Sequence, residues 1–172
     1  MKSFTPPLVL ALVCIAVSGL LAFANQLTAP RIAQAQEEKL SKSLVEVFGE
    51  ADYKTVDKSF ENVNQVITDQ NNRAVFDITV DGYSKDGIQA LIGIDGDGKI
   101  CGIGIVSLKE TTGIGTRIEA NDYIGKFIGL DNTDFPDDTI ISGATYSSKG
   151  MRNAVSIAME TYAENKEVIF SE

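Results

Sequence analysis

The sequence ISGATYSS, residues 141–148, stands between an acidic turn and a strongly amphipathic segment. Ser147 or Ser148 is a good helix N-cap, so Thr145 is expected just outside a helix start, where unpaired backbone N–H groups point outward. Such a helix end favours a phosphate group, and a free threonine hydroxyl there can itself carry a phosphate ester. The following apolar residues recur at spacings of three and four and predict one buried helix face: Met151, Ala154, Val155, Ala158, Met159 and Tyr162.

Upstream of this helix the pattern changes to that of strands. Strands are predicted over 74–83, 88–94 and 100–108, and the DGDG sequence at 95–98 is typical of a hairpin turn between the last two. Gly102 and Gly104, inside the last strand, indicate a close backbone approach or a bulge. The strands lie in the middle of the chain and the helices at its ends, so the predicted fold class is α+β with a mainly antiparallel sheet.

Two further helices are predicted. Residues 32–48 place Ile32, Leu40, Leu44, Val45 and Phe48 on one side of a helix that Gly49 ends. The apolar side indicates a helix that packs on its own domain. A glycine-containing loop over 109–115 leads into a second helix, expected around 120–127.

The N-terminal region predicts a membrane anchor. No residue from Ser3 to Pro30 is charged, and Leu8–Ala24 is almost continuously apolar, which with its flanks suits one bilayer-spanning helix. The alternative is a signal peptide cleaved after Ala24. The expected organisation is an anchor over residues 1–30 and a domain over 31–172 that begins with a stem helix. The basic N-terminus is expected in the cytoplasm and the domain outside it.

Composition excludes several functions. The net charge is −9, and the part from Arg31 onward carries −10, which disfavours nucleic acid and anionic lipid surfaces as charge partners. There is no histidine, and the two cysteines, Cys14 and Cys101, are too few for an iron–sulfur cluster or a zinc site. We therefore predict no metal site and no catalytic residue in this chain, and redox chemistry would require a bound organic cofactor.

Several motifs resemble one known family. SGAT at 142–145 resembles the S/T-G-A-T motif of the FMN-binding domain, which occurs in the RnfG protein of Rnf electron-transport complexes and in a related component of the Na⁺-translocating NADH:quinone reductase. KETTGIG at 109–115 resembles the family's K/H-E-T-P-G-L-G loop, and Gly82-Tyr83 and NQLTAP at 25–30 are also similar to RnfG. The resemblance runs from about residue 5 to about residue 160.

The resemblance implies a covalent cofactor. In the family, the last threonine of the motif, here Thr145, receives FMN through a phosphoester made by a flavin transferase. An acidic residue usually stands three positions before the motif serine; that place is Thr139 here, and Asp137 and Asp138 precede it. Tyr83 and Tyr146 are candidates either for stacking on the flavin ring or for ordinary surface aromatics. The predicted cofactor-binding residues are Thr145, Ser142, Gly143, Ala144, Ser147, Ser148, Glu110, Thr111, Thr112 and Gly113.

The resemblance also implies a function. The chain would be an electron relay in a membrane complex that passes electrons between ferredoxin and NAD⁺ and moves Na⁺ or H⁺, with the other Rnf proteins and the lipid bilayer as partners. Two alternatives remain open on the sequence. One is a free-standing, membrane-anchored flavin carrier for extracellular electron transfer, and the other is an anchored binding domain without a cofactor.

Overall fold

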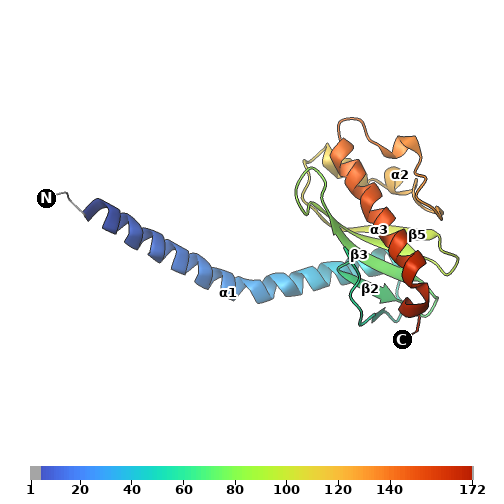
Figure 1. The fold of residues 1–172 in the computed structure, drawn as a ribbon, viewed down its shortest axis with the longest axis horizontal. Coiled ribbons are helices and arrows are strands. Elements are labelled where there is room, and N and C mark those ends of the chain that lie inside the picture. The colour runs from blue at the N-terminus through green and yellow to red at the C-terminus, as the bar shows by residue number, and fades with distance from the viewer. Residues whose placement is uncertain (1–4, 172) are drawn as a thin grey trace. The chain divides into compact units, whose positions relative to one another are not determined.

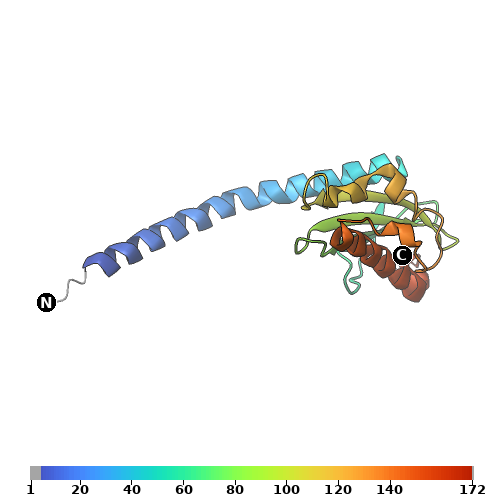
Figure 2. The ribbon, with the colours of Figure 1, turned by 90° about the horizontal axis from the view of Figure 1, so that it is seen from above.

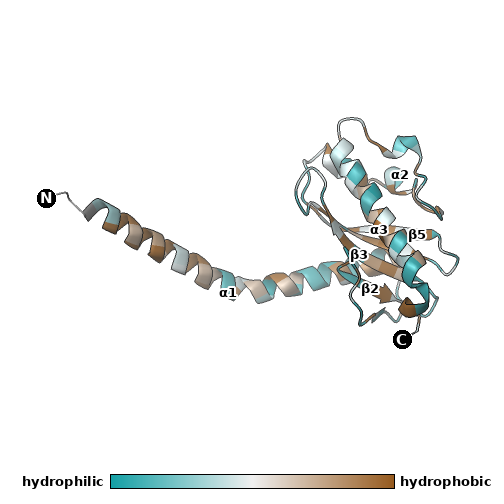
Figure 3. Cartoon of the chain, in the orientation of Figure 1, coloured by the Kyte–Doolittle hydropathy of each residue, from teal (hydrophilic) through white to brown (hydrophobic). Residues whose placement is uncertain are grey.

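The computed structural model describes residues 5–171, and it starts with the long helix α1 (Thr5–Phe48). Pro30 lies inside this helix, which continues to Phe48 and ends where Gly49 adopts a φ of 81°. The predicted stop at Gly49 is therefore confirmed, because a positive φ costs glycine little. Figure 3 shows the first half of α1 as mainly hydrophobic and the second half as mainly hydrophilic.

A boundary between two compact units falls between Ser41 and Lys42, so the last turns of α1 belong to the C-terminal unit. Among the apolar residues that were predicted to share one side of the helix over 32–48, Leu44 and Phe48 are buried, whereas Ile32 and Val45 are exposed. The helix thus packs on its domain only through its last turns.

The C-terminal unit contains one five-stranded sheet whose strands follow each other in chain order, each antiparallel to the next. The strands are β1 (Lys54–Thr55), β2 (Gln65–Thr68), β3 (Ala74–Val80), β4 (Ile88–Ile94) and β5 (Ile100–Leu108). The predicted class, α+β with an antiparallel sheet, is confirmed, and the bounds of β4 and β5 match the prediction. Strand β3 ends at Val80 rather than at residue 83, and β1 and β2, too short to show an alternating pattern, were not predicted.

One face of the sheet packs against helix α3 (Thr145–Ile169), as Figures 1 and 2 show. Phe76 on β3 pairs across the sheet with Ile92 on β4, which pairs with Ile103 on β5, and all three are buried. The Phe76 ring meets the Tyr162 ring of α3 edge to face, with centroids 6.4 Å apart. All six apolar residues predicted on one face of α3 are buried, which confirms that the helix covers a core.

The last turns of α1 cover the opposite face (Figure 2). Glycines of β4 and β5 make room for them. Gly93 and Gly102 are cross-strand partners, and a Cβ on either would collide with the Phe48 ring. A Cβ on Gly104 would lie 2.9 Å from Val47 Cγ2. The close approach that the strand glycines predicted is thus made by α1.

The segment between β5 and α3 contains only short helical turns. They are the 3₁₀ turn η1 (Gly115–Glu119), helix α2 (Asn121–Ile124) and the 3₁₀ turn η2 (Asp137–Thr139). The helix expected around 120–127 is therefore shorter than predicted. It ends before Gly125, and Lys126 and Phe127 continue as turns whose N–H groups donate to carbonyls three residues back.

Candidate cofactor site

The start of α3 differs from the prediction. Helix α3 begins at Thr145, and its N-cap is Ala144, which offers no side-chain acceptor. Ser147 and Ser148 lie inside the first turn, so their prediction as N-caps is wrong. Both side chains are buried and bonded elsewhere: Ser147 Oγ donates to Glu110, and Ser148 Oγ donates to the Ala144 carbonyl at 2.9 Å and accepts from the Ile141 N–H at 3.0 Å.

The turn before the helix exposes the backbone of its first residues. Gly143 has a φ of 84°, and the Ala144 N–H donates to the Ile141 carbonyl at 3.0 Å, so the chain reverses tightly before Thr145. Within the described residues, the N–H groups of Thr145, Tyr146 and Ser147 donate to no protein acceptor; the first bonded one is that of Ser148, to Ala144. Three free donors at the positive end of a 25-residue helix suit an anionic oxygen group.

Glu110 lies in the loop after β5 and reaches across to two other segments. Its Oε1 accepts from the Ser84 N–H at 3.0 Å, and its Oε2 accepts from the Tyr83 N–H at 3.1 Å and from Ser147 Oγ. Burial alone raises the pKa of Glu110, but the hydrogen bonds from Ser147, Ser84 and Tyr83 outweigh it and hold this pKa below its usual value. The side chain is therefore a buried, ionised carboxylate at neutral pH.

These segments enclose a cleft of about 280 Å³. It is lined by Tyr83, Glu110, Thr111, Ile114, Gly115, Gly143, Ala144, Thr145, Tyr146 and Ser147. Two of these residues are highly exposed aromatics: Tyr83 is 74% exposed and Tyr146 is 68% exposed, and their rings meet edge to face with centroids 6.2 Å apart. The cleft thus combines flat apolar surface with the donors at the start of α3.

The structure brings together most, but not all, of the predicted site residues. Glu110, Thr111, Gly143, Ala144, Thr145 and Ser147 line the cleft, whereas Ser142, Ser148, Thr112 and Gly113 do not. Ser142 is exposed beside the cleft, and its carbonyl accepts from Arg117 Nη1 at 3.3 Å. Gly113 is exposed with a φ of 77° and shapes the loop from outside.

Two lining residues, Ile114 and Gly115, were named neither among the predicted cofactor-binding residues nor, like Tyr83 and Tyr146, as candidates for stacking on the flavin. A Cβ on Gly115 would lie 2.7 Å from Glu110 Cβ and 2.8 Å from Ser147 Oγ, so a side chain there would push these two residues apart. The sequence contained a signal for them, because both residues complete the KETTGIG loop whose earlier residues, Glu110 to Gly113, belong to the predicted site.

Comparison with known proteins defines the class. Residues 82–160 match the family model of the FMN-binding domain, and these residues include the whole cleft. Residues 8–47 match the model of the RnfG N-terminal region, which covers most of α1. The chain is therefore an RnfG-like protein with an FMN-binding domain.

The curated proteins that it resembles include G subunits of ion-translocating oxidoreductase complexes. The one from Shewanella piezotolerans is 27% identical over 95% of this chain and 91% of its own length. The one from Pseudomonas aeruginosa is 27% identical over 93% of this chain and 88% of its own length. A third, from Cereibacter sphaeroides, is 32% identical over 74% of this chain and 64% of its own length. The similarity thus extends across both the helix and the domain.

Proposed function

We propose that this chain is the electron-relay component of an ion-translocating ferredoxin:NAD⁺ oxidoreductase complex of the Rnf type, with FMN joined to Thr145 through a phosphoester. The observation that carries the proposal is the position of Thr145. It is exposed, it is the first residue of α3, and it lines the cleft of the FMN-binding domain. A flavin transferase supplied by the cell would form the bond between Thr145 Oγ1 and the FMN phosphorus: the hydroxyl loses its proton, the phosphoanhydride bond of a flavin dinucleotide donor breaks, and a nucleoside monophosphate leaves.

The donors around Thr145 fit a phosphodiester. Such a group keeps one negative charge, and the free N–H groups of Thr145, Tyr146 and Ser147 are placed to stabilise it together with the helix dipole. FMN supplies the electron-accepting ring. The exposed aromatic faces of Tyr83 and Tyr146 offer it apolar contact while leaving it near the surface, where electrons pass to and from partner proteins.

The exposed hydroxyls of the site allow a matched experiment. Thr145→Val keeps the branching and removes the hydroxyl, so we expect a folded protein without covalent FMN. Thr111→Val makes the same change on the facing loop, and Ser142→Ala removes the exposed serine of the motif; both variants should keep covalent FMN. Mass spectrometry of the peptides that contain Thr145 and Thr111 is the readout. An FMN adduct on Ser142 or Thr111, or one retained in Thr145→Val, contradicts the proposal.

We propose that α1 anchors the domain in the membrane. The helix contains a stretch long and apolar enough to cross a bilayer, and the residues from Leu8 to Phe23 that are large and apolar are exposed on it. The anchor is assigned to residues 1–30 and the FMN-binding part to 31–172. A mature protein whose N-terminal sequence begins at Asn25 would contradict the anchor.

The orientation follows from charge. Lys2 keeps the N-terminus in the cytoplasm, and the acidic domain then lies outside it. Lys85 is exposed between β3 and β4, so a Lys85→Cys substitution in a Cys101→Ser background provides a reporter. We expect a membrane-impermeant thiol reagent to label it in intact cells. Labelling that requires lysis places the domain inside.

A further inference from the structure

We propose that Glu110 is a positioning residue: its carboxylate fixes the two aromatic walls of the cleft relative to each other and keeps a negative charge beside the flavin, which lowers the flavin's reduction potential. The first half of this inference concerns the protein alone. The second half rests on the proposed function, because it requires bound FMN.

The hydrogen bonds of Glu110 join the two walls. The N–H groups of Tyr83 and Ser84 donate to the carboxylate from the loop that carries the Tyr83 ring. Ser147 Oγ donates to it from the first turn of α3, next to Tyr146. One carboxylate therefore sets the spacing between Tyr83 and Tyr146, whose rings are in contact across the cleft. Its role is to hold other groups in place, and its two oxygens are already occupied by protein donors.

The surroundings are built to admit this carboxylate. A Cβ on Gly82 would lie 2.7 Å from Glu110 Oε1, and a Cβ on Gly87 would lie 2.5 Å from the same atom. On the other side, a Cβ on Gly115 would lie 2.8 Å from Oε2. Gly82, Gly87 and Gly115 thus leave a space for the carboxylate, here called the socket, and a side chain at any of these three positions would fill it. A socket of this kind points to the carboxylate as the group around which the cleft is assembled.

The charge in this socket has no cationic partner. Among the described residues, no lysine or arginine forms an ion pair with Glu110, and all its donors are neutral N–H and O–H groups. Neutral dipoles stabilise the carboxylate without cancelling its charge. Glu110 is 9% exposed, so water screens its charge less than that of a surface carboxylate. A net negative charge on the wall of the cleft disfavours the addition of electrons to a ring bound there.

The test uses the full chain in detergent and compares Glu110→Gln with Asp95→Asn. Both substitutions turn an acid into its amide, and Asp95 lies at the other end of β5, in the β4–β5 turn. Hydrogen exchange is measured on the peptide that contains Tyr83 and Ser84, and the midpoint potential is measured on flavin-loaded protein. We expect Glu110→Gln to speed exchange at these amides roughly tenfold or more and to shift the potential upward. Asp95→Asn should do neither.

Two further variants separate the positioning role of Glu110 from the effect of its charge. Glu110→Asp keeps the charge and shortens the side chain, so exchange at Tyr83 and Ser84 should rise while the potential moves less than in Glu110→Gln. Ser147→Ala keeps both the charge and the bonds to Tyr83 and Ser84, and it removes only the tie to α3. We expect slower exchange in Ser147→Ala than in either Glu110 variant.

The outcomes distinguish this inference from the proposed function. Wild-type protein that never acquires FMN contradicts the proposed function. The exchange measurement needs no flavin, so it still tests whether Glu110 holds the two walls of the cleft. Loaded protein whose potential is the same in wild type, Glu110→Gln and Glu110→Asp overturns the charge effect. Unchanged exchange at Tyr83 and Ser84 in both Glu110 variants overturns the positioning role of Glu110.

Discussion

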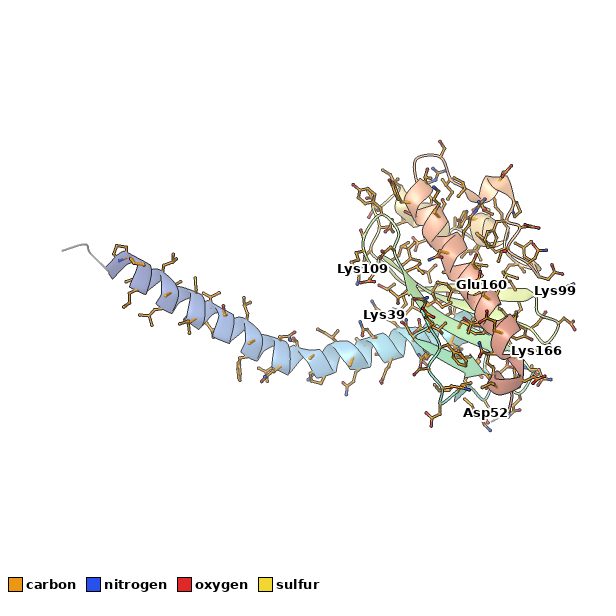
Figure 4. The ribbon with its side chains drawn as sticks, in the orientation of Figure 1. Lys39, Asp52, Lys99, Lys109, Glu160 and Lys166 are labelled. Carbon is orange, nitrogen blue, oxygen red and sulfur yellow. The ribbon has the colours of Figure 1, made fainter. Side chains whose placement is uncertain are left out.

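The two ends of strand β5 each carry a turn organised by one carboxylate, and the two carboxylates act over very different lengths of chain. Before β5, Asp95 Oδ1 accepts from the N–H groups of Asp97 at 3.0 Å and Lys99 at 2.9 Å, two and four residues away. After β5, Glu110 accepts from residues 26, 27 and 37 positions away. Lys99 and Lys109, which flank the strand, mark these two ends on opposite sides of the domain in Figure 4.

The sequence separation of the donors distinguishes the Asp95 turn, which is a local structure, from the Glu110 loop, which is part of the cleft. The donors of the Asp95 carboxylate lie within the turn itself, so the shape of this turn is set locally, although Tyr162 and Lys166 of α3 also donate to its Asp95 and Gly96 carbonyls. The Glu110 carboxylate meets its donors only when the Tyr83 loop and the first turn of α3 are both in place. The end of β5 that depends on long-range contacts is the one that lines the cleft.

The largest contrast is expected from removing each carboxylate. Glu110→Ala leaves three donors without their acceptor, two of them backbone N–H groups, and should lower the free energy of unfolding by about 3 kcal/mol. Asp95→Ala removes two hydrogen bonds at the surface and should cost about 1 kcal/mol. Urea unfolding followed by circular dichroism measures both. Equal losses would mean that the distance over which the carboxylate acts is irrelevant to stability.

Acid titration gives a smaller effect at the same residue. The folded pKa of Glu110 lies below the ordinary value of 4.5, so its ionised form is favoured by folding. The stability that it contributes is present above about pH 4.5 and is lost as the pH falls through the folded pKa. Unfolding curves between pH 6 and pH 3 should therefore fall less steeply for Glu110→Gln than for wild type. Parallel curves would show that the Glu110 pKa is the same in both states.

A pair of glycines sharpens the comparison further. Gly98 in the β4–β5 turn has a φ of 85° and Gly113 in the Glu110 loop has a φ of 77°. A Cβ on Gly113 would meet nothing within 4 Å, and one on Gly98 would make an ordinary contact with Tyr162 Cε1 at 3.7 Å. Each Gly→Val substitution should cost roughly 1–2 kcal/mol through backbone strain. Only Gly113→Val should change the spectrum of bound flavin, because its loop also carries Thr111 and Ile114 into the cleft. A spectral change in Gly98→Val of the same size would contradict this.

The smallest effect is expected from the surface lysines. Lys166 Nζ donates to the Gly96 carbonyl at 2.8 Å and lies 5.4 Å from the Tyr162 ring centroid, so Lys166→Met should cost about 0.5 kcal/mol. Lys109→Met is the control at the other end of β5, and thermal unfolding of the two variants provides the measurement. A larger loss for Lys109→Met would indicate that its charge acts on Glu110.

Much of the fold was predictable because its determinants are local or periodic. The bounds of β4 and β5, the turn between them, the buried face of α3 and the stop at Gly49 all followed from residues close together in the chain. The resemblance of SGAT and KETTGIG to the FMN-binding domain was also visible in short motifs and is confirmed by the family match. The covalent link to Thr145 stays a prediction.

The remaining features depend on contacts between distant segments. Helix α3 starts at Thr145 because Ser147 and Ser148 are drawn into buried hydrogen bonds with Glu110, Ala144 and Ile141, although their residue types are typical of N-caps. The glycines of β4 and β5 accommodate Phe48, which a strand pattern does not reveal.

The sequence by itself determined the strands β4 and β5, the buried face of α3, the end of α1 and the motif that marks the cofactor. Hydrogen bonds within a turn and the alternation of apolar residues act over a few positions. A short stretch of sequence therefore contains all the information that specifies them. The tertiary structure decided which polar groups are free at the cleft and which are already used. A side chain such as Glu110 has the same donors and acceptors in every fold, and only packing determines which partners reach it.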